Sequence, residues 1–302
     1  MNKILFNDPV AIVTNNTCNL TCAHCGHLNN YNFMGRSPWS QFKTFYEKWS
    51  EIVDFAEIDL LGGEPFLIPD LEQWICNLRR LWPTSKITVG TNGTLLHLDK
   101  NKLLSRKIID QNCVIKVCCH TKDQYKEIEA NLLSILKSYN ADIQEDVSYS
   151  EKNELQRRFF INGKFVAELH EVYYFYHSFP KQVVDGTVYL DNGDREISHD
   201  KCWSKFCFAI QDGLLFKCPL NYTYAQNKNT WNYEPWAREI LDQYQPCSPF
   251  DDKDSIEKFL IEIKNSVPQC SLCAYDKKTQ PIDITIPIVF DKSNKKMFKI
   301  SQ

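Results

Sequence analysis

The chain has 302 residues, of which 43% are hydrophobic and 24% charged, and its formal net charge is −3. This length is enough for one large folded domain and a smaller one. Acidic and basic residues are mixed along the chain without a long basic stretch, which excludes nucleic acid as an expected partner.

No targeting segment is expected from the sequence. The start of the chain, Met1 to Val13, is mildly apolar but short and contains Asp8-Pro9, so it lacks the long apolar region and cleavage site of a signal peptide. No apolar run approaches the roughly 20 residues of a membrane-spanning helix. We therefore expect a soluble, cytoplasmic protein with no membrane partner. In such a protein, 13 cysteines in clustered spacings indicate metal ligands more than disulfides.

Strands and helices are predicted to alternate from residue 10 to about residue 140. The first helix is expected to begin at Pro38, with Ser37 as its N-cap. Apolar periodicity predicts strands at 10–13, 58–61, 86–89 and 114–119, and helices at 39–53, 71–81, 99–105 and 124–139. This order is typical of a parallel sheet, in which ligands bind at the carboxyl ends of the strands.

The alternation ends after about residue 155. A β-hairpin is predicted around Asn162-Gly163, and another around Asp212-Gly213, between strands at 206–210 and 214–218. We place a domain boundary near 180–195.

Three cysteines, Cys18, Cys22 and Cys25, follow the first predicted strand in the spacing C-x3-C-x2-C. Four thiolates would close a [4Fe–4S] cluster, whereas three leave one iron open to a ligand that is not protein. A zinc site or buried thiols are the alternatives, but a zinc site would need a fourth protein ligand.

These three cysteines resemble the signature of the radical SAM superfamily, residue for residue. The resemblance implies that S-adenosylmethionine binds the open iron and is cleaved reductively to a 5′-deoxyadenosyl radical, which abstracts a hydrogen atom from the substrate. It also implies an electron donor such as flavodoxin or ferredoxin. His24 takes the place of the family's usual aromatic residue near the adenine, where an imidazole can also stack.

Gly62-Gly63-Glu64-Pro65 follows the second predicted strand and resembles the family's motif for the SAM amino group. An ammonium group needs carbonyl oxygens and a carboxylate, which Glu64 supplies, and glycines let the backbone come close. On its own, this run is a weak signal and indicates a turn.

The ends of the third and fourth predicted strands carry Thr91, Asn92 and His120. By the resemblance, these positions contact the ribose or the substrate. Turn chemistry is an equal alternative for Asn92-Gly93, and a structural role is the more common one for a histidine such as His120.

Cys118 and Cys119 end the fourth strand, so one of them should point into a barrel interior. A thiol there could return a hydrogen atom to a substrate radical, which makes the pair candidate catalytic residues. The alternative is a small buried apolar side chain.

The C-terminal cysteines resemble the twitch domain, a short form of the SPASM domain that holds an auxiliary [4Fe–4S] cluster. By this resemblance Cys218, Cys270 and Cys273 are ligands, and either Cys202 or Cys207 completes the set. Cys202 fits the family spacing, and Cys207 lies opposite Cys218 across the predicted hairpin. A four-cysteine zinc site is the alternative.

The resemblance implies an α/β fold: a partial (β/α)6 TIM-type barrel followed by a small cysteine-rich hairpin and helix domain. We expect the radical SAM core at 1–185, the twitch-like domain at 195–280 and a C-terminal tail at 281–302.

The expected substrate is a small polar metabolite of the sugar or aminocyclitol type, which is oxidised or epimerised. A ribosomally made peptide, crosslinked or epimerised, is the alternative. The first strand begins by residue 10, with no leader-binding region before it, which favours the small molecule. A metal-bound scaffold without catalysis is the third possibility.

Overall fold

The first half of the chain builds four strands joined by helices. The computed structural model describes residues 3–22, 25–27, 29, 35–120, 122–150, 154–172, 174–175, 182–184, 187–202, 205–229, 231–273, 282–283, 288–291 and 296–299. The strands are β1 (Ile4–Val13), β2 (Val53–Leu61), β3 (Lys86–Thr91) and β4 (Val114–Cys119). The helices are α1 (Trp39–Ile52), α2 (Leu71–Leu81), α3 (Asp99–Asp110) and α4 (Tyr125–Lys137). The predicted alternation is confirmed, although β1 and β2 begin earlier than their apolar runs.

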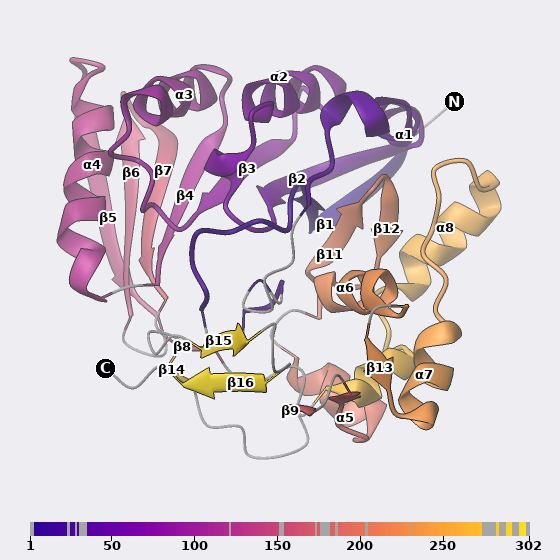
Figure 1. Ribbon diagram of the computed structural model, residues 1–302. Coiled ribbons are helices and arrows are strands. Elements are labelled where there is room, and N and C mark those ends of the chain that lie inside the picture. Colours follow the sequence, from indigo (N-terminus) through magenta and orange to yellow (C-terminus); the bar gives the residue numbers. More distant parts are fainter. Residues whose placement is uncertain are drawn as a thin grey trace.

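Further strands extend this sheet on both sides (Figure 1). An antiparallel set, β5 (Ile143–Tyr149), β6 (Leu155–Ile161) and β7 (Lys164–Glu171), adds to β4 through β7. The hairpin β11 (Phe208–Gln211) and β12 (Leu214–Phe216) adds to β1. The nine strands follow the order β12-β11-β1-β2-β3-β4-β7-β6-β5. Both predicted hairpins, around Asn162-Gly163 and Asp212-Gly213, are confirmed.

The α/β class and the parallel sheet are confirmed, because β11, β1, β2, β3, β4 and β7 all pair in parallel. The regular β/α repeat stops after α4, where the chain turns through β5 and β6 before it reaches β7. In the strands that the structure describes, β12 and β5 are the two edges of the sheet. Closure into a barrel therefore stays a prediction.

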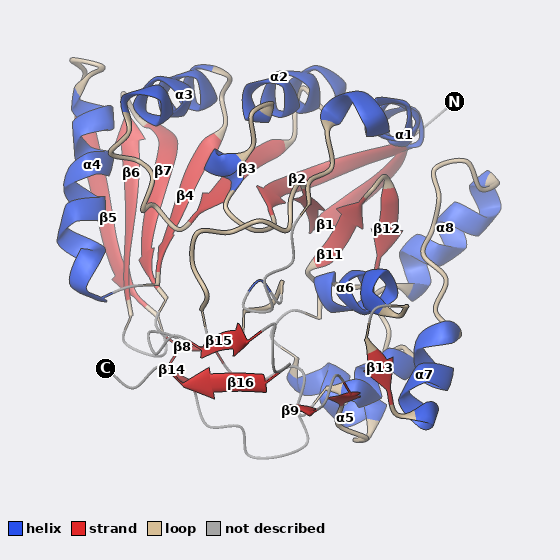
Figure 2. Ribbon diagram, viewed as in Figure 1, coloured by secondary structure: helices blue, strands red, loops and turns tan. Residues whose placement is uncertain are grey.

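Helices α1 to α4 cover one face of the sheet (Figure 2). The main core lies between them and includes the buried Trp49, Trp74 and Trp82. Strand side chains alternate in direction, so every second residue points to the opposite face, which we call the inner face. The indole Nε1 of Trp49 donates to the carbonyl of Gly213 at 2.8 Å, which ties α1 to the β11–β12 turn.

The prediction that Ser37 caps α1 is wrong. The helix begins at Trp39 without a side-chain cap from the residue before it. The hydroxyl of Ser37 donates instead to the carboxylate of Asp212 at 2.5 Å. The backbone N–H of Trp39 donates to Asp70 at 2.9 Å, so a carboxylate from the start of α2 satisfies this helix end.

The C-terminal third contains short helices and small sheets. The helices are α5 (Arg195–Lys201), α6 (Pro219–Asn227), α7 (Pro235–Asp242) and α8 (Lys253–Glu262). The 3-10 helices are η2 (Pro65–Leu67), η3 (Lys122–Gln124) and, in this third, η4 (Pro268–Leu272). The small strands are β8 (Tyr174–Phe175), β9 (Gln182–Val184), β10 (Thr187–Tyr189), β13 (Asn232–Tyr233), β14 (Ile282–Asp283), β15 (Ile288–Asp291) and β16 (Lys296–Lys299).

A second apolar cluster in this third packs β10, α6, α7 and η4 together. The β11–β12 hairpin, in contrast, belongs to the main sheet. The boundaries 1–185, 195–280 and 281–302 stay predictions. No helix in the described part of the chain has the length and apolar character that crossing a membrane requires.

Candidate functional site

The three-cysteine loop begins five residues after β1 ends. The backbone N–H of Leu20 donates to the sulfur of Cys18 at 3.4 Å, and that of Cys25 donates to the carbonyl of Cys22 at 3.3 Å. Burial raises the pKa of Cys18 to about 11, and the charges of Cys25 and Glu64 add to this. The pKa of Cys22 is also raised, first by burial and then by the charges of Cys25 and Cys18. The structure therefore brings the three thiols within electrostatic reach of one another.

The glycine run after β2 packs directly against the chain that leads into this loop. The N–H of Gly63 donates to the carbonyl of Asn15 at 2.8 Å, and that of Glu64 to the carbonyl of Thr17 at 2.9 Å. A Cβ on Gly63 would lie 2.0 Å from the Thr17 oxygen, and one on Gly62 would lie 2.4 Å from the Asn15 oxygen. The sequence predicted that these glycines let the backbone approach a ligand. In the structure they let it approach residues 15–17.

Asn15 adds a side-chain link between the same two segments. Its Nδ2 donates to the carbonyl of Thr17 at 2.8 Å and to that of Glu64 at 3.2 Å. No sequence pattern pointed to Asn15. An asparagine at a strand end is a common turn residue, and one of its two partners, Glu64, lies 49 positions away, after the neighbouring strand β2.

The Glu64 carboxylate is completely buried and accepts three hydrogen bonds. The donors are the N–H of Phe66 at 3.1 Å, the Thr91 hydroxyl at 2.7 Å and the N–H of Asn92 at 2.8 Å. Burial raises its pKa from 4.5 to about 7, while the three hydrogen bonds act in the opposite direction. Glu64 thus joins the end of β2 to the end of β3. Its predicted role in holding an ammonium group stays a proposal.

Asn92 contacts the cysteine loop from the end of β3. Its Nδ2 donates to the Asn19 side chain at 2.9 Å and to the sulfur of Cys18 at 3.8 Å. Its Oδ1 accepts from the N–H and hydroxyl of Thr94, at 3.0 and 2.6 Å. The turn role weighed for Asn92 is confirmed, and the residue also reaches the cysteine loop. Its predicted contact with the ribose or the substrate stays a prediction.

Two further predicted residues lie apart from these contacts or outside the described chain. The ring Nδ1 of His120 lies 3.1 Å from the carbonyl of Val172, and burial lowers the pKa of the imidazole. His120 therefore connects the chain after β4 to the chain after β7. His24 lies outside the described residues, so its predicted stacking stays a prediction.

Cys118 and Cys119 point to opposite faces of the sheet. Cys119 is fully buried in the core under the helices. Cys118 lies on the inner face, where burial raises its pKa to about 11, Lys116 lowers it, and Glu168 and Asp59 raise it. Of the two candidates, only Cys118 is on the face that a bound substrate could contact.

The inner face also carries a row of charged side chains that the sequence analysis missed. We call Asp59 on β2, Lys116 on β4, and Glu168 and His170 on β7 the inner-face row. Lys116 lies opposite Glu168 in the β4–β7 register, and Cys118 lies opposite His170. His170 Nε2 contacts the carboxylate of Glu168. Burial opposes the charge on Lys116, but the charges of Cys118, Glu168 and Asp59 outweigh it and raise its pKa.

A signal for the inner-face row existed in the sequence. Asp59, Lys116 and Glu168 each stand between two apolar neighbours inside a strand, whereas His170 follows Leu169 and precedes Glu171. Such alternation ordinarily indicates a face exposed to solvent. In this sheet the polar positions are half-buried, and burial raises the pKa of Asp59, against the opposing charge of Lys116.

Four of the C-terminal cysteines surround a single cavity of about 30 Å³. Cys202, Cys218, Cys270 and Cys273 all line it, and Cys207 does not. Of the two residues left open in the sequence analysis, Cys202 therefore joins this set. Cys207 is buried near Asp59 and Lys116, and burial raises its pKa to about 11.

The thiols of this four-cysteine set are strongly desolvated. Burial raises the pKa of Cys218 to about 12, with further increases from the charges of Cys270 and Cys202. The pKa of Cys273 is raised in the same way. Four thiol donors suit iron–sulfur ligation or zinc. In the described part of the chain, no three His, Cys, Asp or Glu side chains are arranged to hold one metal ion.

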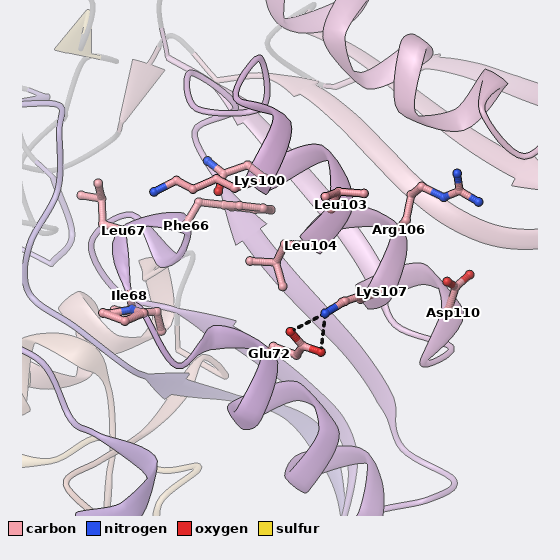
Figure 3. A pocket seen from close by; sticks show the side chains of 12 residues that line it. Phe66, Leu67, Ile68, Glu72, Lys100, Leu103, Leu104, Arg106, Lys107 and Asp110 are labelled. Carbon is pink, nitrogen blue, oxygen red and sulfur yellow. Dashed lines mark hydrogen bonds and ion pairs between the residues drawn. The ribbon is translucent and has the colours of Figure 1, made fainter.

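A separate cavity lies away from all of these residues. It has a volume of about 610 Å³ and is formed by η2, α3 and the start of α2 (Figure 3). Lys107 donates to both carboxylate oxygens of Glu72 at 2.8 Å across it. It contains no cysteine and none of the predicted site residues, so its size does not make it the candidate site.

Comparison with known proteins gives structural matches only. No family model matches the chain, and the search of curated proteins finds no match. Among solved structures, BtrN in complex with AdoMet and 2-DOIA is 15% identical with a TM-score of 0.45, and the match covers 91% of this chain and 94% of that one.

Two further matches are partial. BtrN in an open conformation is 25% identical with a TM-score of 0.32 over 42% of this chain, which here spans about half, 56%, of BtrN. SuiB of Streptococcus suis, bound to the precursor peptide SuiA, is 17% identical with a TM-score of 0.28 over 45% of this chain and 38% of SuiB. The chain is similar to these structures over the shares given.

Proposed function

We propose that this chain is a radical SAM enzyme that acts on a small polar metabolite. The observation that carries the proposal is the convergence of three segments: the Cys18–Cys22–Cys25 loop, the Gly62–Glu64 run and Asn92. They are joined by the hydrogen bonds of Asn15 and Glu64 and by the Asn92 contact with the Cys18 sulfur. The chemistry of the donor set fits a [4Fe–4S] cluster with one iron open to S-adenosylmethionine.

When bound, the cluster and S-adenosylmethionine would supply reductive cleavage to a 5′-deoxyadenosyl radical, which takes a hydrogen atom from the substrate. The protein residues hold the cysteine loop in place. Gly62 and Gly63 allow it to pack closely on the end of β2, and the buried Glu64 fixes the neighbouring end of β3. A single-electron donor such as flavodoxin or ferredoxin belongs to this proposal.

The four-cysteine set is proposed to hold an auxiliary [4Fe–4S] cluster. Its members are Cys202, Cys218, Cys270 and Cys273, which surround one cavity. The proposal excludes Cys207 from the ligands, because it does not line that cavity. Cys207 instead lies near Asp59 and Lys116, so the segment that carries Cys202 and Cys207 comes close to the inner-face row.

The inner-face row supports a substrate that offers several hydroxyl or amino groups. Asp59 and Glu168 accept hydrogen bonds and Lys116 donates them, all from one face of the sheet. Cys118 lies beside them and keeps its hydrogen at neutral pH, because its pKa is about 11. A hydrogen-atom donor to a substrate radical must be in this S–H form. We therefore propose Cys118, and not Cys119, for that role in an epimerisation, after which the thiyl radical left on its sulfur takes up a proton and one electron from the single-electron donor. In an oxidation the substrate radical instead gives up an electron and a proton, and Cys118 donates no hydrogen atom.

Anaerobic reconstitution with iron and sulfide tests the two cluster proposals. The wild-type chain should bind about eight irons, and Cys270→Ala/Cys273→Ala about four. Reduced protein with S-adenosylmethionine should form 5′-deoxyadenosine, and Cys18→Ala should form none. If the wild-type chain forms none, the radical mechanism is wrong. If the wild-type chain binds only about four irons, the auxiliary cluster is wrong.

The substrate class is tested by the yield of 5′-deoxyadenosine above the background without substrate. A pool of amino sugars and aminocyclitols should raise the yield for wild type and for the exposed control Lys137→Met on α4, but not for Lys116→Met or Glu168→Gln. A larger increase with a pool of ribosomal precursor peptides would favour the peptide substrate instead.

A further inference from the structure

A buried lysine, Lys217, lines the cavity of the four-cysteine set. It directly precedes Cys218 and is 3% exposed. Its Nζ donates to the carbonyl of Lys205 at 3.1 Å and to the carbonyl of Ile263, and it lies 3.2 Å from Nε2 of His199. An ammonium group has three hydrogens, so these three acceptors satisfy it completely.

The three acceptors come from the segments that carry the other cysteines. His199 lies on α5, three residues before Cys202, and Lys205 lies three residues after Cys202. Ile263 directly follows α8, and from it the chain runs into η4 with Cys270. One ammonium group therefore connects all three cysteine-bearing segments: residues 199–205, residues 217–218 and the chain from Ile263 into η4.

Lys217 is also the buried cation of this cavity. The other lysine in the cavity lining, Lys205, turns its ammonium group to the exposed carboxylate of Asp200 at 3.6 Å. The charge of Lys217 acts on Cys270, Cys218 and Cys202, while Glu196 and Asp191 contribute negative charge nearby. Four thiolates carry negative charge into this buried site, and buried charge needs a counter-charge.

We infer that Lys217 is a positioning residue for the group bound by the four cysteines. Its hydrogen bonds hold the three cysteine-bearing segments together, and its positive charge stabilises the reduced, more negative state of the bound cluster. This inference rests on the proposed auxiliary cluster. It assigns to Lys217 two effects that can be separated, one on iron retention and one on reduction potential.

The experiment uses the full chain with Cys18→Ala/Cys22→Ala/Cys25→Ala, so that only the four-cysteine site can hold a cluster. We compare this background protein, which retains Lys217, with its Lys217→Gln and Lys217→Met variants. Glutamine keeps two N–H donors and loses the charge, whereas methionine loses both. The matched control is Lys201→Met, which removes an exposed charge that is likewise adjacent to a proposed ligand, Cys202.

Iron content and an anaerobic redox titration followed by electron paramagnetic resonance are the readouts. Lys217→Gln should retain iron. At the same applied potential, its ratio of reduced to oxidised cluster should be about tenfold lower, which corresponds to a reduction potential about 59 mV more negative for one electron. Lys217→Met should retain less than half of the iron of the background protein. Lys201→Met should match the background protein in both measurements.

Equal potentials for Lys217 and Lys217→Gln, with iron bound in both, would overturn the charge effect. Full iron retention by Lys217→Met would overturn the positioning effect. If the background protein itself takes up no iron, the inference fails together with the auxiliary cluster. The proposal for the Cys18 loop is unaffected by that outcome, since those cysteines are absent from the protein tested.

Discussion

The side-chain amide of Asn92 donates a hydrogen bond to the sulfur of Cys18, with 3.8 Å between nitrogen and sulfur. The donor comes from the end of β3 and the acceptor from the loop after β1, so two strand ends meet at one thiol. Hydrogen bonds to cluster sulfurs are among the factors that set a cluster's reduction potential.

Replacement of Asn92 by aspartate should therefore make the potential of the cluster proposed at Cys18, Cys22 and Cys25 more negative. Asn92→Asp retains an oxygen for Thr94, removes the donor to Cys18 and adds negative charge. We expect a shift of at least about 59 mV, a tenfold change in the one-electron equilibrium. A redox titration checks it, with Asn77→Asp on the exposed side of α2 as control. An unchanged potential would show that the contact has no electronic effect.

Gly63→Ala should disrupt the cysteine loop. The added Cβ would lie 2.0 Å from the carbonyl oxygen of Thr17, which is backbone and cannot rotate away. We expect a loss of about 2–4 kcal/mol in the free energy of unfolding, as for other substitutions that overpack a buried contact. Chemical denaturation measures it.

Gly26→Ala is the control for Gly63→Ala, since nothing lies within 4 Å of a Cβ at that position beside Cys25. It should be close to wild type in stability. Equal stability of Gly63→Ala and Gly26→Ala would mean that residues 15–17 can move away from β2.

The buried carboxyl of Glu64 should make stability depend on pH. Its pKa is raised to about 7 in the folded protein by burial, from 4.5. The folded state then binds the proton more tightly than the unfolded state does. The stabilisation of the folded state by protonated Glu64 is therefore fully present below pH 4.5. This stabilisation is lost as the pH rises through about 7, which lowers the free energy of unfolding by about 3 kcal/mol.

Urea denaturation from pH 4.5 to 8 tests this for wild type and Glu64→Gln. The glutamine cannot ionise, so its free energy of unfolding should fall less over this range. The exposed Glu51→Gln should keep the wild-type slope. Parallel curves for wild type and Glu64→Gln would show that Glu64 does not titrate in this range.

The two adjacent cysteines of β4 should respond differently to serine. Cys119→Ser places a hydroxyl in the apolar core and should lower the free energy of unfolding by about 1–3 kcal/mol. Cys118→Ser changes a half-buried polar face and should alter it by less than about 0.5 kcal/mol. Thermal denaturation of both variants measures the difference. A larger loss for Cys118→Ser would contradict the assignment of the two faces.

The alternation of apolar runs predicted the part of the fold that depends on local pattern. The parallel strands from Val10 to Cys119 and the hairpin turn at Asp212-Gly213 follow from periodicity and turn residues. The pairing of β11 with β1 could not be predicted, because it joins residues about 200 positions apart. The apolar pattern of each strand would suit many other partner strands equally well.

The candidate site shows the same limit. Cys18, Cys22, Cys25 and Glu64 were named from their spacing and position. Glu64, however, faces three donors of its own chain, which no sequence pattern indicates. Lys217 was missed because its three acceptors, two of them backbone carbonyls, come from distant segments. Every residue has a backbone carbonyl, so the sequence does not indicate which of them will accept a hydrogen bond.

The position of the β11–β12 hairpin has one further consequence. β1 leads to Cys18 and β12 leads to Cys218, and only β11 lies between these two strands. β11 is parallel to β1 and antiparallel to β12, so the chain leaves β1 toward Cys18 and leaves β12 toward Cys218 at opposite ends of the strands. The separation of the two proposed cluster sites is therefore tied to strand pairing and not to the length of a linker. A shift of one residue in the β1–β11 register would move the hairpin by about 3.3 Å along β1.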